Sequence, residues 1–139
     1  MDKFVNIIGA GLAGSEAALQ LAQRGVHVRL FEMRPETETD VHRGGDCAEL
    51  VCSNSLKSTK PESAAGMLKA ELAALGSQLI AAAGRSRVDA GGALAVDRDE
   101  FSADVTSMVK ENPYIEYRVM CVSDPLDASL GVADATILA

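Results

Sequence analysis

Apolar and polar residues follow one another in blocks that predict α/β structure. Residues 4–8 (FVNII) are an apolar run long enough for a buried strand, and residues 26–31 (VHVRLF) form a second one. Between them, residues 15–24 are rich in Ala, Leu and Gln, which favour a helix. Gly25 is suited to ending that helix, because glycine readily adopts the left-handed conformation. The start of the chain therefore predicts a strand, a helix and a second strand.

The pattern is weaker in the middle of the chain. Residues 33–61 show no clear periodicity, but an apolar string at 48–52 predicts an ordered loop over a site. A second helix is expected from Glu62 or Ser63 to Gly84, because Leu and Ile recur there at helical spacing. After it, residues 93–96 are expected to form a short apolar strand or an extended piece, and Asp97 is expected to cap a third helix with Glu100 as its capping-box partner. A strand at 114–122, a turn region at 124–131 and a strand at 135–138 should follow.

The order of these elements predicts a Rossmann-like α/β domain, with a parallel sheet built from right-handed βαβ units. The last expected strand is followed at once by the final residue, Ala139. In such folds ligands bind at the carboxyl ends of the strands, where a domain rarely stops. We therefore expect residues 1–139 to be the N-terminal part of a truncated dinucleotide-binding domain.

A glycine loop directly after the first strand carries the clearest chemical signal. It matches G-x-G-x-x-G, opens a helix and is followed by Glu32 at the end of the next strand. Gly9 allows a tight turn, Gly11 lets backbone N–H groups reach a diphosphate, and Gly14 lets the helix pack close to the sheet. The helix N-terminus favours an anion there. The residues expected to bind the cofactor diphosphate are Gly9, Ala10, Gly11, Leu12, Ala13 and Gly14.

Two residues after this loop bear on the choice of cofactor. Glu32 lies 18 residues beyond Gly14, where a carboxylate can accept hydrogen bonds from ribose hydroxyls, and it argues against an NADP 2′-phosphate at this site. Arg34 keeps an NADP 2′-phosphate open, because an arginine can bind that group. It could equally stack on an adenine or contact another phosphate. The motif alone leaves FAD and NAD as alternatives.

Composition narrows the class of protein. The 139 residues suffice for one domain, and a core of Ala, Val, Leu and Ile is expected because aromatic residues make up only 4%. The net charge of −7 argues against strong nucleic-acid binding by this chain alone. No apolar run approaches the length of a membrane span and no signal-peptide pattern is present. A cytoplasmic location is expected. The three cysteines, an odd number, are therefore expected to be reduced thiols and not to form a disulfide framework.

Four strings together resemble one family: residues 8–18 (IGAGLAGSEAA), 31–35 (FEMRP), 48–56 (AELVCSNSL) and 91–98 (GGALAVDR). It is the folate- and FAD-dependent tRNA (uracil-5-)-methyltransferase family, related to the glucose-inhibited-division flavoproteins. The resemblance spans nearly the whole chain, but only the N-terminal portion of the family's longer sequence. It implies that methylenetetrahydrofolate donates a carbon to C5 of the T-loop uridine of tRNA. Reduced FAD would supply reducing equivalents, and NAD(P)H would reduce the flavin again.

The resemblance also implies residue roles. The glycine loop would bind the FAD diphosphate, Glu32 would hold the ribose, and Asp97 and Arg98 would lie near the flavin. Cys52 would be the catalytic cysteine, with a second catalytic cysteine and most of the tRNA surface in the portion absent here. The chemistry suits a thiolate, which activates uracil C5 by adding at C6 and needs a nearby positive group such as Lys57.

Simpler interpretations remain open for several residues. Cys52 could be a buried, inert thiol, and Asp97 and Arg98 could be a helix cap and a solvated side chain. Ser53, Asn54 and Ser55 could bind flavin or substrate, or only form a turn. We assign no role to Cys47 and no metal site, and we expect Cys121 to be a small strand hydrophobe, His27 to be structural and His42 to be an ordinary loop residue. A small basic patch is possible at Arg43, Lys57, Lys60, Arg85 and Arg87.

Two other functions compete with the methyltransferase. A different flavin-dependent oxidoreductase could share only the cofactor domain, because fold does not fix function. A truncated chain could also bind nucleotide without catalysis. The string around Cys52 favours the methyltransferase, since a generic oxidoreductase has no need of it.

Overall fold

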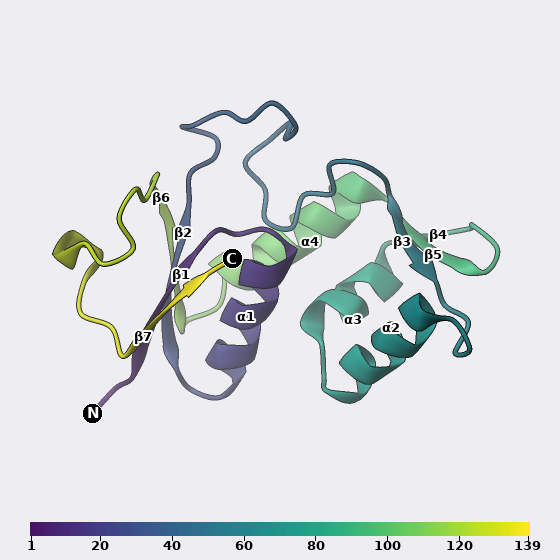
Figure 1. The fold of residues 1–139 in the computed structure, drawn as a ribbon, viewed down its shortest axis with the longest axis horizontal. Helices are drawn as coiled ribbons and strands as arrows, with labels where there is room; N and C mark the ends of the chain where they lie inside the picture. The colour runs from purple at the N-terminus through teal and green to yellow at the C-terminus, as the bar shows by residue number, and fades with distance from the viewer.

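A four-stranded parallel sheet organises the larger part of this computed structural model, which describes all 139 residues (Figure 1). Its strands are β1 (Phe4–Ile8), β2 (His27–Glu32), β6 (Ile115–Val119) and β7 (Ala135–Leu138). Their order is β6-β2-β1-β7, and every neighbouring pair is parallel. This order matches the 3-2-1-4 part of the Rossmann strand order 3-2-1-4-5-6. The predicted Rossmann-like α/β architecture is therefore confirmed.

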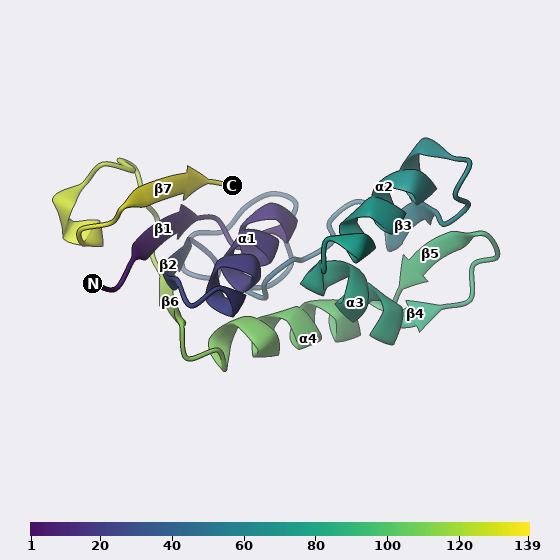
Figure 2. The ribbon, with the colours of Figure 1, turned by 90° about the horizontal axis from the view of Figure 1, so that it is seen from below.

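Two helices cover one face of this sheet (Figure 2). Helix α1 (Leu12–Gln23) connects β1 to β2, and α4 (Arg98–Lys110) precedes β6. Helix α1 begins three residues earlier than the predicted Ser15, so the end of the glycine loop forms its first turn. The buried side chains of these helices are mainly Ala18, Leu19 and Ala22 of α1 and Phe101, Val105 and Val109 of α4.

Residues 55–96 form a small lobe, seen on the right in Figure 1, whose buried side chains share one hydrophobic core with the sheet and α4. Its elements are β3 (Ser55–Ser58), α2 (Ala64–Ala74), α3 (Gln78–Arg85), β4 (Arg87–Val88) and β5 (Ala93–Val96). Strand β5 pairs antiparallel with both β3 and β4, so the prediction that 93–96 belongs to the parallel sheet is wrong. The sequence does not predict β3 because this strand is short, mostly polar and irregular. Its pairing with β5 stabilises it.

The single helix predicted from residue 62 or 63 to Gly84 is also wrong. Gly76 adopts a left-handed conformation, with φ of +80°, just after the end of α2. Ser77 then caps α3, accepting a hydrogen bond from the N–H of Ile80 at 3.1 Å. The helical spacing of leucines continues from α2 into α3, so periodicity alone predicts one helix where the structure has two.

The end of the chain differs from expectation in smaller ways. Asp97 caps α4 as predicted, but its own N–H donates to the Ser86 carbonyl at 2.8 Å, so Glu100 does not complete a capping box. Strand β6 ends at Val119, so Cys121 is exposed beyond it and is not a strand hydrophobe. The predicted turn region contains a short 3-10 helix, η1 (Ala128–Leu130). No helix combines the length and apolar character needed to cross a membrane.

Candidate functional site

The glycine loop lies at the carboxyl end of β1, at the edge of the sheet where ligands bind in this fold. Gly9 has φ of +106°, and its N–H donates to the Phe31 carbonyl at 2.8 Å. A Cβ at Gly14 would overlap the Gly9 carbonyl oxygen, whereas a Cβ at Gly11 would meet no atom within 4 Å. Gly9 and Gly14 thus allow a tight turn and close packing, and Gly11 leaves open space.

The N-terminus of α1 differs from those of the other α-helices. Side chains of Ser63, Ser77 and Asp97 accept hydrogen bonds from the first N–H groups of α2, α3 and α4. Gly11 caps α1 and provides no such acceptor. The first N–H groups of α1 therefore face the open space beside Gly11 without a side-chain partner. This arrangement fits an anionic group such as a diphosphate.

Glu32 at the end of β2 is buried and fully hydrogen-bonded. Its Oε2 accepts from the Ala10 N–H at 2.9 Å, and its Oε1 accepts from the N–H and Nε of Arg34, both at 3.0 Å. Arg34 Nη2 adds a bond to Oε2 at 3.2 Å. Burial alone would raise the pKa of Glu32, but these hydrogen bonds and the charge of Arg34 lower it. Any ribose hydroxyl bound here would have to replace one of these donors.

Arg34 is 3% exposed and joins Glu32 to the loop that follows. Its Nη1 donates to Glu49 Oε2 at 2.9 Å and to the Gly44 carbonyl at 3.4 Å, and its Nη2 donates to the Asp46 carbonyl at 3.2 Å. With the bonds to Glu32, all five N–H donors of the guanidinium have acceptors. In this arrangement Arg34 joins the end of β2 to the loop of residues 44–49, and its predicted contact with a cofactor stays a prediction.

Residues 43–54, here called the Cys52 loop, are held in place at several points. Glu49 accepts from the N–H groups of Arg43 at 2.6 Å and Gly44 at 3.2 Å. The Ala48 N–H donates to the Ala10 carbonyl of the glycine loop at 2.8 Å. Ala48 has φ of +54°, which is uncommon for a residue other than glycine. The predicted ordered loop is confirmed, and it lies directly against the glycine loop.

The Cys52 loop is also fixed to the elements on its other side. The Cys47 N–H donates to Thr106 Oγ1 on α4 at 2.8 Å. Arg98 Nη1 donates to the Leu50 carbonyl at 3.4 Å. Asn54 exchanges bonds with Val96 of β5: its carbonyl accepts from the Val96 N–H at 2.9 Å, and its Nδ2 donates to the Val96 carbonyl at 3.2 Å. These bonds join the loop to both the sheet and the small lobe.

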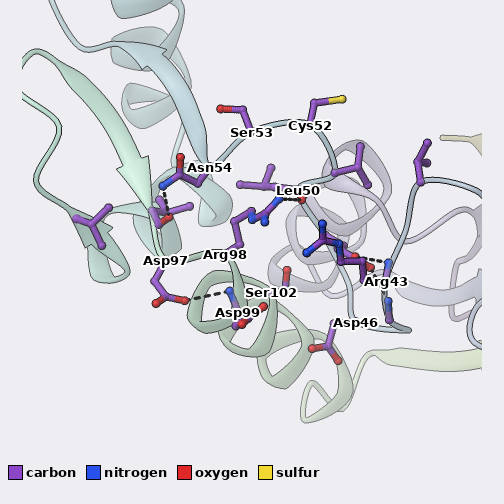
Figure 3. Close-up of a pocket in the computed structure, with 16 residues that line it drawn as sticks. Arg43, Asp46, Leu50, Cys52, Ser53, Asn54, Asp97, Arg98, Asp99 and Ser102 are labelled. Carbon is purple, nitrogen blue, oxygen red and sulfur yellow. Dashed lines mark hydrogen bonds between the residues drawn. The ribbon is translucent and has the colours of Figure 1, made fainter.

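A cavity of about 700 Å³ opens between the Cys52 loop, the end of β5 and the start of α4 (Figure 3). Several predicted site residues line it together: Cys52, Ser53, Asn54, Asp97 and Arg98. The glycine loop, Glu32 and Arg34 are not among its lining residues, and neither is Lys57. The sequence thus points to two neighbouring regions, a glycine-loop region and a cavity, joined by the Cys52 loop.

The cavity residues differ in how free their side chains are. Cys52 is exposed, and Figure 3 shows it with Ser53 at the rim, on the side of the loop away from Asp97. The Asp97 carboxylate is used as the cap of α4. Arg43 and Arg98 are the cations in the lining. Ser102, which sequence reasoning missed, also lines the cavity, and its buried hydroxyl has no hydrogen-bond partner.

The remaining cysteine and histidine candidates have structural surroundings. Cys47 is fully buried, and burial raises the pKa of its thiol. His27 lies between Phe4 and Tyr114, with ring centroids 5.1 Å and 5.0 Å away. His42 Nδ1 is 2.7 Å from Thr39 Oγ1. These contacts place all three side chains within the fold, and the absence of a catalytic role stays a prediction.

The model of one protein family, described as glucose inhibited division protein A, matches residues 4–133. The chain belongs to this family. Among curated relatives, the methylenetetrahydrofolate–tRNA-(uracil-5-)-methyltransferase TrmFO of Bacillus licheniformis is 57% identical over 115 residues, which are 83% of this chain and 26% of that protein. TrmFO of Bacillus subtilis is 60% identical over 111 residues, 80% of this chain and 26% of that protein.

This member of the glucose inhibited division protein A family spans about a quarter of the length of these relatives. Among solved structures, a mutant of MHPCO matches 84% of this chain and 32% of its own, with 15% sequence identity and a TM-score of 0.47. The Rossmann-like assignment of this family member rests on the strand order described above.

Proposed function

We propose that this chain supplies part of the FAD site and the Cys52 segment of a folate- and FAD-dependent tRNA (uracil-5-)-methyltransferase. The observation that carries the proposal is the hydrogen bond from the Ala48 N–H to the Ala10 carbonyl. It holds the loop that bears Cys52 against the glycine loop. The names of relatives at 57% and 60% identity support the same reaction.

In this proposal the glycine-loop region binds the cofactor, and the cavity holds the residues that act beside it. The glycine loop, residues 9–14, would bind the FAD diphosphate through the free N–H groups of α1, with Glu32 beside the ribose. Asp97 and Arg98 would lie toward the flavin, since they line the cavity with Cys52. Bound FAD would supply the reducing equivalents, with methylenetetrahydrofolate as carbon donor and NAD(P)H as the source of electrons.

Cys52 is the residue of this chain best placed to act on uridine. It is exposed at the cavity rim, so a base from outside could reach its thiol. A thiolate that adds to C6 of uracil makes C5 nucleophilic, and it could share nucleophile and base duties with a second cysteine. Arg43 and Arg98 are the positively charged residues that line the same cavity, whereas Lys57, first considered as the positive group near Cys52, does not line it.

The distribution of charge bears on the proposed contact with tRNA. The small lobe carries five basic and three acidic side chains, whereas the rest of the chain carries eight basic and seventeen acidic ones. Of the basic patch considered above, Arg85 pairs with Asp104 at 2.8 Å, while Lys57, Lys60 and Arg87 make no ion pair. Contacts with tRNA phosphates through this lobe would therefore be few, and the main tRNA surface would lie in the portion that only the longer relatives span.

The experiment compares methyl transfer with generic flavin oxidation, in a protein that spans the full length of its relatives. Unmodified tRNA is incubated with radiolabelled methylenetetrahydrofolate, FAD and NAD(P)H. We expect label in tRNA, lost in Cys52→Ala and retained in Cys121→Ala, which removes another exposed thiol. NAD(P)H oxidation without labelling, and insensitive to Cys52, would instead support an oxidoreductase that shares only the cofactor domain.

A further inference from the structure

Glu16, two residues beyond the last glycine of the loop, makes an unusual set of contacts outside its own helix. The residue is half-buried on α1. Its Oε1 accepts from the Gln78 N–H at 3.0 Å, and its Oε2 accepts from the Leu79 N–H at 3.0 Å and from Ser77 Oγ at 2.6 Å. Gln20 Nε2 donates to Oε1 at 2.9 Å. One carboxylate on α1 thus receives three hydrogen bonds from the start of α3.

These bonds complete the cap of α3. The first N–H groups of a helix have no partner within it, and a negative charge at this end is favourable. Ser77 satisfies the Ile80 N–H, and Glu16 satisfies the two N–H groups before it. Burial would raise the pKa of Glu16, but hydrogen bonds from Ser77, Gln20 and the two backbone groups lower it. The ionised carboxylate is therefore the form that this contact favours.

The other end of α3 leads to the cavity. The Ser86 carbonyl, just after α3, accepts from the Asp97 N–H at 2.8 Å. Asp97 lines the cavity, and its neighbour Val96 is hydrogen-bonded to Asn54, two residues after Cys52. Helix α3 therefore lies between α1, which begins at the glycine loop, and the β4–β5 pair (Figure 2). Val96 at the end of β5 lines the cavity as well.

We propose that Glu16 is a positioning residue that fixes the small lobe, and with it the Cys52 side of the cavity, relative to the glycine loop. The inference rests on the proposed function, in which FAD held by the glycine loop works beside Cys52. Glu16 would touch neither FAD nor uridine. Its substitution should leave FAD binding largely intact and loosen the spatial relationship between bound FAD and Cys52.

The test measures how well bound FAD shields Cys52 from a thiol reagent. The chain carries Cys121→Ser, so that Cys52 is the exposed thiol and Cys47 is buried. Free FAD is set at about ten times the measured Kd of each variant, which should slow modification of Cys52 about tenfold if only the unbound fraction reacts. In Glu16→Ala we expect FAD still to bind, with the protection reduced to about twofold or less.

Two further variants keep the test decisive. Glu71→Gln removes an exposed carboxylate on α2 that makes no hydrogen bond and should retain full protection. Glu16→Gln keeps the size of the side chain but only one acceptor oxygen, so it should lose part of the protection of Cys52 by bound FAD. It serves as the test if Glu16→Ala fails to fold. A folded Glu16 variant with a lower melting temperature but full protection would show a merely structural role and overturn the inference.

The remaining outcomes separate the inference from the proposed function. A folded Glu16→Ala chain that no longer binds FAD would show that Glu16 acts on the glycine loop itself, which would also overturn the inference. If bound FAD fails to shield Cys52 even without a Glu16 substitution, the proposed function is contradicted and the inference is overturned with it.

Discussion

Arg34 Nη1 donates a hydrogen bond to Oε2 of Glu49 at 2.9 Å, across fifteen positions of sequence. The same guanidinium binds Glu32, so it joins the end of β2 to the loop that carries Cys52. Both carboxylates are largely shielded from water, with 6% and 16% of their side chains exposed. One buried cation is therefore among the contacts that hold the loop over the glycine loop.

Replacing Arg34 should be costly to stability. Arg34→Met would leave the Glu32 carboxylate buried without its cation, a change that typically costs about 3–5 kcal/mol of unfolding free energy. Arg34→Lys should also destabilise, because a single ammonium cannot supply five donors in a planar fork. Urea unfolding measures both, with Arg118→Met as the control at an exposed pair, where about 0–1 kcal/mol is expected. Equal losses at the two sites would contradict the account.

Acid should weaken the folded chain through Glu16 and Glu32. Both have a pKa lowered by folding, so their ionised forms favour the native state. The stability they contribute is present above the ordinary carboxyl pKa of the unfolded chain and is lost as pH falls through the lower folded value. Urea unfolding between about pH 6 and pH 3 measures this. Glu16→Gln should show a shallower fall, and an unchanged slope would count against the Glu16 contacts.

The three thiols should separate into two classes. Cys52 and Cys121 are exposed, while Cys47 is fully buried with a raised pKa. A chromogenic thiol reagent near neutral pH should therefore modify two cysteines quickly and the third only after a denaturant is added. Cys52→Ala should remove one fast thiol and Cys47→Ala only the slow one. A fast third thiol would show that the loop does not pack as described.

The elements that the sequence predicts well have strong local signals. Gly25 follows α1 with φ of +73°, as expected of a glycine that ends a helix. Asp97 caps α4, and Phe101, Val105 and Val109 form its buried face. The small lobe has no such signal, because β3 and β4 are short and become strands only by pairing with β5.

The site follows the same division. The sequence predicts the tight turn and the close helix packing of the glycine loop, because a Cβ at Gly9 or Gly14 would overlap backbone atoms. A Cβ at Gly11 would meet no atom, and the cofactor contacts of the loop stay a prediction. The roles of Arg34 and Glu16 depend on partners that folding brings together from distant segments, so spacing alone does not show them. The string AELVCSNS contains Glu49, yet only the structure shows that Glu49 shapes the loop before Cys52.

Two glycines of the loop should respond differently to alanine. At Gly14 a Cβ would overlap the Gly9 carbonyl oxygen, so Gly14→Ala should separate α1 from β1 and destabilise the chain by several kcal/mol, of order 2–4. Gly11 has φ of −71° and open space around it, so Gly11→Ala should change the unfolding free energy by about 0.5 kcal/mol or less. Thermal unfolding followed by circular dichroism compares them. Similar losses would show that the loop packs differently.

The most direct test of the cofactor site is the visible absorption spectrum of the purified chain after addition of FAD and desalting. The account predicts a retained flavin band, which is lost in Gly11→Ala even though that variant stays folded, because a methyl group would enter the space beside the free N–H groups of α1. A folded chain that emerges colourless, or a Gly11→Ala chain that retains the flavin as well as the parent does, would contradict the assignment of the glycine loop as the FAD diphosphate site.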